Sequence, residues 1–211
     1  MKFVKVITIV VLSLSSLAAI ACLGLLSAED YMIREQAAYE EPAESQIYDP
    51  EIFAYDANRG ELREEYFGIK LADLKQDEEG HYIMTDQQRE TFIKNILGKH
   101  MCSPQWISWK DFGSVSISYG ADNILYVKGG QTSKTNGDFL EMYGTLTVIN
   151  PLHLQFNGQI ITCVEHINDG KPVKREGTYN FTVAGQRRYW RMQEMNNPKD
   201  GYCDYVDIYF D

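Results

Sequence analysis

Apolar and polar residues alternate along the C-terminal half of the chain with the period of two that a strand with one buried face requires. The pattern is clearest in residues 177–195, where Tyr179 and Phe181 alternate with polar residues. A turn at Gly185 joins two such segments, because glycine tolerates positive φ. The sequence therefore predicts a hairpin whose apolar face places Tyr179 opposite Trp190.

The opposite face of this hairpin is polar and basic, since it carries Arg187, Tyr189 and Arg191. A guanidinium offers a planar fork that suits a carboxylate or a phosphate. These three residues, with the neighbouring Trp190, are therefore the predicted ligand-binding residues. The alternative is that the arginines pair with the protein's own acids, such as Asp207, and lie across aromatic rings.

Eight segments after residue 104 fit the strand pattern, and turns such as Asn157-Gly158 connect them. Short connections favour an antiparallel meander that forms a closed or partly open barrel, with a two-layer sandwich as the alternative. The predicted fold class is mainly β, and it is lipocalin-like in architecture only, because no Gly-x-Trp signature opens the first strand. The predicted strands are residues 113–119, 122–129, 138–149, 151–157, 159–167, 173–183, 186–195 and 203–210.

One helix is predicted before the strands, over residues 85–97. Thr85 and Gln88 have the spacing of a capping box, and Gly98 follows as the expected C-terminal stop. Between them, apolar residues recur at helical spacing. A helix of about 12 residues is marginal alone in water, so we expect it to pack against the barrel.

The N-terminus has the features of a targeting segment. Lys2 and Lys5 precede an uncharged, mostly apolar run over residues 6–26. Three interpretations remain open, namely a cleaved signal peptide ending near residue 28, an uncleaved membrane anchor, and a bacterial lipoprotein signal lipidated on Cys22. All three place the rest of the chain outside the cytoplasm, in a secreted or periplasmic position, with membrane contact through this segment alone.

Composition divides the chain into four regions. Residues 1–28 are the signal peptide or anchor. Residues 29–50 are strongly acidic without a sustained apolar period, and we expect a disordered tether there. Residues 51–103 form a small α+β lead-in section, and residues 104–211 form the antiparallel barrel domain.

Three cysteines follow the targeting segment, and disulfides persist outside the cytoplasm. Cys102 and Cys203 flank the strand-rich region, so they are the predicted disulfide pair. Cys163 lies inside a strand pattern and is expected to be a buried thiol. The alternative is that all three are reduced.

The charge and the motifs limit the function classes. A net charge of −10 with a pI near 4.9 argues against a nucleic-acid binder, which needs a basic stripe. The four histidines lack metal-ligand spacing, and no Cys-x-x-Cys, nucleophile elbow, P-loop or dinucleotide fingerprint is present. No metal, no cofactor and no catalytic residue are therefore predicted, and nothing in the sequence supports an enzyme.

Two functional classes remain. The first is a non-enzymatic extracytoplasmic binding module that takes a small amphipathic or anionic ligand, or an acidic protein partner. The second is a protein-interaction, inhibitor or assembly factor of the cell envelope with a packed barrel. A cavity lined by Trp, Tyr and Arg would favour the first class, whereas a filled interior with an exposed apolar patch would favour the second.

Overall fold

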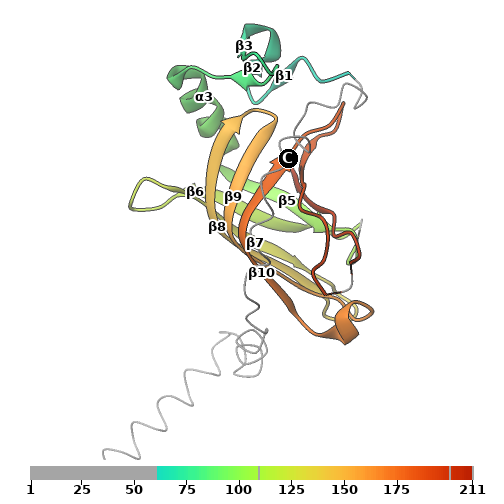
Figure 1. Ribbon diagram of the computed structural model, residues 1–211. Coiled ribbons are helices and arrows are strands. Elements are labelled where there is room, and N and C mark those ends of the chain that lie inside the picture. Colours follow the sequence, from blue (N-terminus) through green and yellow to red (C-terminus); the bar gives the residue numbers. More distant parts are fainter. Residues whose placement is uncertain (1–60, 109, 200, 211) are drawn as a thin grey trace, which may run out of the picture. The chain divides into compact units, whose positions relative to one another are not determined.

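The computed structural model describes residues 61–108, 110–199 and 201–210. Eight antiparallel strands close into one barrel (Figure 1). Each strand pairs with the next one along the chain, and the last strand returns to the first. The strands are β5 (Gly98–Pro104), β6 (Gly113–Tyr119), β7 (Leu125–Thr132), β8 (Phe139–Asn150), β9 (His153–Cys163), β10 (Val173–Thr182), β11 (Tyr189–Met192) and β12 (Val206–Tyr209). The predicted mainly β meander is confirmed, and the barrel excludes the sandwich.

The barrel begins earlier than the predicted boundary at residue 104. β5 starts at Gly98, inside the range assigned to the lead-in section, and it pairs with both β6 and β12. The strand was missed because polar His100 occupies an inward position. Its ring nitrogens lie 2.9 Å from the Tyr209 carbonyl oxygen and 2.8 Å from the Ile96 carbonyl oxygen. A neutral ring carries one N–H and can donate to one of these two carbonyl oxygens, and that bond pairs a buried histidine in an otherwise apolar row.

A second correction concerns Asn157-Gly158, which is not a turn. β9 runs through it from His153 to Cys163, so the predicted strands 151–157 and 159–167 are one strand. Gly158 is required by close packing, because a Cβ there would lie 2.3 Å from the Tyr143 carbonyl oxygen. The predicted count of eight holds because this surplus strand is offset by the missed β5.

The interior of the barrel is occupied by inward-facing side chains. Phe156, Phe181 and Trp190 come from three successive strands, β9, β10 and β11, and all are fully buried. The Phe156 and Phe181 rings meet edge to face at 6.3 Å, a favourable aromatic geometry. Each fully buried apolar side chain of this size contributes about 1.5–3 kcal/mol, so these rings are a main source of stability.

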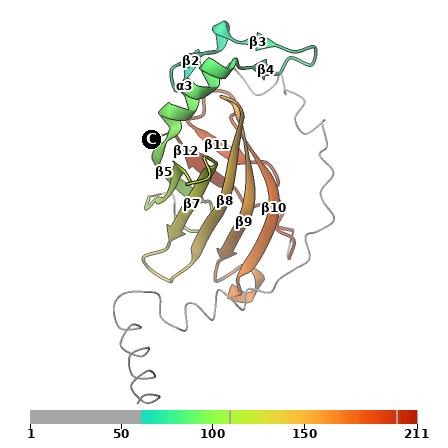
Figure 2. The ribbon, with the colours of Figure 1, turned by 90° about the vertical axis from the view of Figure 1, so that its left-hand side faces the viewer.

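A short α+β section precedes the barrel and covers one end of it (Figure 2). Its helix α3 spans Asp86–Ile96, and the predicted capping box is present, with Thr85 and Gln88 bonded reciprocally. Phe92 and Ile96 on α3 are fully buried in the core. The section also contains β1 (Glu65–Tyr66), β2 (Ile69–Lys70), the 3-10 turn η2 (Leu71–Asp73), β3 (Lys75–Gln76) and β4 (Tyr82–Ile83).

The predicted disulfide between Cys102 and Cys203 is not formed, and Cys163 is also a free thiol. Cys102 is fully buried among core residues on β5, and burial raises the pKa of its thiol to about 12. Cys203 is exposed in the connection before β12. The two thiols therefore occupy opposite environments, because β5 turns Cys102 inward.

The predictions for the N-terminus lie outside the described residues. They concern the signal peptide or anchor at 1–28, lipidation of Cys22 and the tether at 29–50. In the part of the chain that the structure describes, no helix combines the length and hydropathy that a membrane span needs.

Candidate binding surface on the outer barrel face

The central hairpin has the predicted faces but a different register. Phe181 pairs with Met192, which displaces the strands by four residues from the arrangement with Tyr179 opposite Trp190. The connecting loop is correspondingly longer than a two-residue turn at Gly185. Side chains alternate with a period of two, so a displacement by an even number leaves the paired residues of β10 and β11 on their expected faces, while Gln186 and Arg188 lie exposed in the longer loop.

Trp190, one of the predicted ligand-binding residues, is a core residue. Its side chain is fully buried, and its indole Nε1 donates a hydrogen bond to the Pro151 carbonyl oxygen at 3.1 Å. Its ring stacks on Phe67 at 5.3 Å and lies 4.5 Å from the Phe210 ring. The ring therefore joins the barrel to the covering section and contributes nothing to an exposed surface.

Arg191 has the structural role that was the alternative in the sequence analysis. Its Nε and Nη2 donate to the two carboxylate oxygens of Asp207, each at 2.7 Å. Its guanidinium also lies over the rings of Tyr205 at 4.2 Å and Tyr189 at 5.1 Å. Burial raises the pKa of Asp207, and the hydrogen bonds from Arg191 oppose that effect. Arg191 is thus held in place by the fold.

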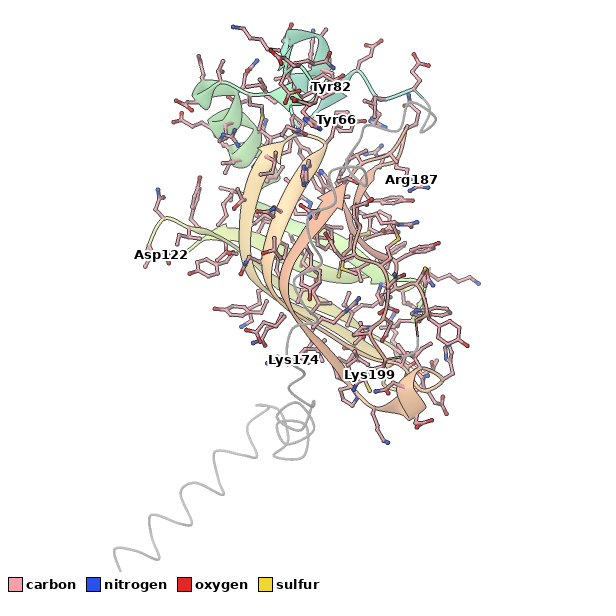
Figure 3. The ribbon with its side chains drawn as sticks, in the orientation of Figure 1. Tyr66, Tyr82, Asp122, Lys174, Arg187 and Lys199 are labelled. Carbon is pink, nitrogen blue, oxygen red and sulfur yellow. The ribbon has the colours of Figure 1, made fainter. Side chains whose placement is uncertain are left out.

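Arg187, in contrast, is exposed at the end of the β10–β11 loop, where its side chain extends from the barrel wall (Figure 3). Its guanidinium lies 5.6 Å from the centre of the Tyr189 ring. The structure therefore brings Arg187, Tyr189 and Arg191 together on the outer face as predicted. Of these two arginines, Arg187 has the more solvent-exposed side chain and is therefore the more accessible to a partner.

Aromatic rings continue from Tyr189 across the neighbouring strands. The Tyr189 and Tyr209 rings are 5.2 Å apart, and the Tyr209 and Phe112 rings are 5.0 Å apart. The chain of contacts runs from β11 over β12 and β5 to the start of β6. We call Arg187, Tyr189, Tyr209 and Phe112 the outer strip.

The outer strip ends in a shallow groove of about 430 Å³ on the outer face of β5, β6 and β7. Met101 and Phe112 are 37% and 38% exposed there, so both side chains are accessible from solvent. Gly113 and Gly130 keep the strands close, because a Cβ on Gly113 would lie 2.2 Å from the Gly130 carbonyl oxygen. The groove is lined by Lys99, Met101, Phe112, Gly113, Ser114 and Gly130.

The sequence analysis missed the groove residues. Met101 could not be assigned to the outer face while β5 was unrecognised, and Phe112 precedes its strand. The groove also depends on the closure between β12 and β5, which brings Tyr209 next to Phe112 across about a hundred residues of sequence. In the sequence, Lys99, His100, Met101 and Cys102 run polar, polar, apolar and apolar, so no period of two marked β5, although these side chains alternate between exposed and buried in the structure.

A family model described as the PM1083 family matches residues 77–210, which include α3 and all eight barrel strands. The chain belongs to the PM1083 family. It is 38% identical over 128 residues to a Pasteurella multocida (strain Pm70) protein described as "Uncharacterized protein PM1083", a match that covers 61% of this chain and 82% of that protein. No solved structure matches the chain.

The outer wall of the barrel also carries a polar cluster that is separate from the outer strip. It consists of His153, Asn180 and Glu194. The His153 Nε2 lies 2.8 Å from the Asn180 Oδ1, while the Asn180 side-chain and backbone N–H groups donate to the Glu194 carboxylate, each at 2.8 Å. Since the Asn180 Nδ2 donates to Glu194, the Asn180 Oδ1 accepts a hydrogen bond from the Nε2–H of His153. Burial lowers the pKa of His153 below its ordinary value of 6.5.

This pKa shift predicts a pH dependence of stability. Because folding disfavours the protonated ring, the unfolded chain takes up the proton first as the pH falls, and the contribution of His153 declines below pH 6.5. We expect His153→Gln to show a smaller loss of unfolding free energy than the wild type between pH 7.5 and 5.5 in urea melts. His81→Gln, at an exposed histidine, is the control. A wild-type-like decline in His153→Gln would contradict the assignment.

Inside the barrel, Arg175 points inward from β10 near the end opposite α3. Its Nη2 lies 3.2 Å from the Asp204 Oδ2, and both side chains are almost fully buried. Asp204 also accepts hydrogen bonds from Trp106 Nε1 at 2.9 Å and Asn197 Nδ2 at 3.1 Å. Among the described residues, Arg175 Nε and Nη1 have no hydrogen-bond acceptor.

One group of metal-ligating residue types occurs in the described ranges, at Asp77, Glu79 and His81. Asp77 accepts hydrogen bonds from the backbone N–H groups of Glu79 and His81, at 3.0 and 2.7 Å. This bonding pattern is that of a solvent-exposed turn stabilised by its own aspartate. The group therefore has a structural explanation.

Proposed function

We propose that this PM1083 family member is a non-enzymatic, extracytoplasmic protein-interaction factor. It binds an acidic partner through the outer strip and the groove. The observation that carries this proposal is the groove with half-exposed Met101 and Phe112, which adjoins the rings of Tyr209 and Tyr189 and the guanidinium of Arg187. Aromatic residues and arginine dominate the binding energy of many protein interfaces.

The barrel core supports the choice of a surface site over an interior one. The rings of Phe156, Phe181 and Trp190 are fully buried and take up part of the space that an interior ligand would need. Exposed Lys99 and Arg187 lie at the two ends of the surface. Complementary charge at the contact itself selects the partner, so a partner with acidic groups at these two positions is favoured.

The position outside the cytoplasm is supported by the sequence alone. Lys2 and Lys5 before a long apolar run, followed by acids, have the order of a targeting segment that exports the residues after it. The choice between secretion, membrane anchoring and lipidation at Cys22 belongs to the same proposal.

A second candidate function is the binding of a small anionic or amphipathic ligand inside the barrel. It is favoured by Arg175, whose buried Nε and Nη1 have no acceptor among the described residues. Buried donors are normally satisfied, so a carboxylate or a phosphate next to Asp204 would complete this site only by displacing part of the surrounding packing. That requirement places it second.

Native mass spectrometry of the protein purified from the extracytoplasmic fraction of its own host separates the two candidates. For the surface proposal, we expect Phe112→Ser to weaken a protein complex by about tenfold or more, because a central interface aromatic is lost. Arg175→Met should retain that complex. Tyr143→Ser, at an exposed tyrosine on β8, is the matched control, and thermal melts verify that each variant is folded.

The outcomes are distinct. A complex that persists in Phe112→Ser contradicts the surface proposal. A small-molecule mass that is present in the wild type and lost only in Arg175→Met supports the interior site in its place. Absence of the protein from the extracytoplasmic fraction contradicts the proposed location.

A further inference from the structure

We propose that residues 48–56 of this chain, Tyr48-Asp49-Pro50-Glu51-Ile52-Phe53-Ala54-Tyr55-Asp56, dock on the outer strip and the groove. The segment acts as an intramolecular occupant that an external partner has to displace. This inference rests on the surface of the proposed function and names the first ligand of that surface.

The described chain begins next to the outer strip. The Nε2 of Gln186, in the β10–β11 loop, donates hydrogen bonds to the carbonyl oxygens of Glu61 and Leu62, at 3.0 and 3.1 Å. Gln186 directly precedes Arg187, the first residue of the strip. The residues before Glu61 therefore start from the Arg187 end of the surface.

The distance to the groove is within reach of the segment. Adjacent strands are about 4.8 Å apart, so the three steps from β11 over β12 and β5 to β6 cover about 14 Å of barrel wall. An extended chain advances about 3.3 Å per residue. Residues 57–60 alone span about 13 Å, and residues 48–56 add about 30 Å, which is enough to cross the strip and enter the groove.

The chemistry of the segment is complementary to the surface. It carries three acids, Asp49, Glu51 and Asp56, and no base, whereas the surface offers exposed Arg187 and Lys99. Asp111, which precedes Phe112 in the chain, is paired with Lys134.

The apolar residues of the segment also match. Ile52 and Phe53 are large enough to cover the half-exposed side chains of Met101 and Phe112. Tyr48 and Tyr55 can stack on the rings of the strip in the offset or edge-to-face geometries that aromatic pairs prefer.

Tethering makes a weak contact sufficient. A short linker holds a ligand at an effective concentration on the order of 1 mM, so a segment with only millimolar intrinsic affinity is docked for a large part of the time. An external partner of higher affinity still displaces it. Arg187 and Phe112 thus face the chain's own acidic segment until such a partner arrives.

Hydroxyl-radical footprinting of the full chain tests this inference. The test variant is Asp49→Asn/Glu51→Gln/Asp56→Asn. The matched control is Glu40→Gln/Glu41→Gln/Glu44→Gln, with the same charge change at positions further along the chain from residue 61. The readouts are the oxidation rates of Met101 and Phe112, and exposed Tyr143 on β8 is the internal reference.

We expect the oxidation rates of Met101 and Phe112 to rise about fivefold in the test variant if the segment is docked about 80% of the time. High salt should raise these rates in the wild type, because it screens the charges. The control variant and Tyr143 should be unchanged.

Equal rates in the wild type and both variants would overturn the inference, as would an equal rise in test and control variants. Protection that increases with protein concentration and survives in the test variant would assign the surface to a second copy of the chain, and would also overturn it. The proposed function is tested separately. If footprinting fails while Phe112→Ser still loses a partner, only this inference is wrong. Docking without any partner complex would contradict the proposed function alone.

Discussion

Replacing Trp190 with alanine is expected to lower the free energy of unfolding by about 3–5 kcal/mol. The ring is fully buried between Phe67 and Phe210, and its removal leaves a cavity and an unpaired Pro151 carbonyl oxygen. Against a typical stability of about 5–15 kcal/mol, this loss is severe. Denaturant melts monitored by circular dichroism measure it directly.

Arg187→Ala is the matched control in the same hairpin. Its guanidinium is exposed and lies over Tyr189, and exposed charge contacts contribute about 0–1 kcal/mol. A loss at Arg187 equal to or larger than the loss at Trp190 would contradict the assignment of the two faces. Trp190→Phe should fall between the two, because it keeps most of the packing and loses the hydrogen bond to Pro151.

Asp207→Asn is expected to lower the free energy of unfolding by about 3–5 kcal/mol, because breaking a buried pair leaves its partner uncompensated. Asp207 is fully buried, and Arg191 bonds to both of its oxygens at 2.7 Å. Arg191→Gln removes the same interaction from the other side, so the double variant should lose clearly less than the two single losses together.

A double-mutant cycle from chemical melts at pH 7 measures this coupling. Additive losses from Asp207→Asn and Arg191→Gln would show that the bidentate contact contributes nothing beyond its separate parts. Arg187→Gln combined with Asp207→Asn provides the comparison, since Arg187 acts on Asp207 through its charge without a hydrogen bond. We expect the coupling of that pair to be clearly smaller.

Local signals were sufficient for several elements. The helix over residues 85–97 was predicted from the spacing of Thr85 and Gln88 and from its apolar stripe, and both features act within a few residues. The two faces of the hairpin were also predicted correctly, because alternation survives an even displacement of register. The sequence left two alternatives for Arg191, namely ligand binding and pairing with an acid such as Asp207. The structure decided between them, because it places Asp207 beside Arg191.

Other features depend on contacts between distant parts of the chain. Asn157-Gly158 has the composition of a turn, but packing against Tyr143 keeps it inside β9. His100 has a polar side chain, but it can be buried in β5 because carbonyl oxygens from β12 and α3 offer hydrogen-bond acceptors to its ring. No local pattern reports such partners, and both corrections therefore required the assembled barrel.

The sequence by itself determined the class of the fold. Short alternating strands joined by short connections pair their backbone groups most directly as an antiparallel meander. In the strands that it revealed, the sequence also determined which side faces the core, because that depends on parity. The tertiary structure decided the candidate surface. The closure of β12 on β5 brings Tyr209 to Phe112, and the exposed Met101 and Arg187 belong to one surface only after that closure. Which outward side chains become neighbours is a property of the strand order and the register, and neither is encoded in the alternation of a single segment.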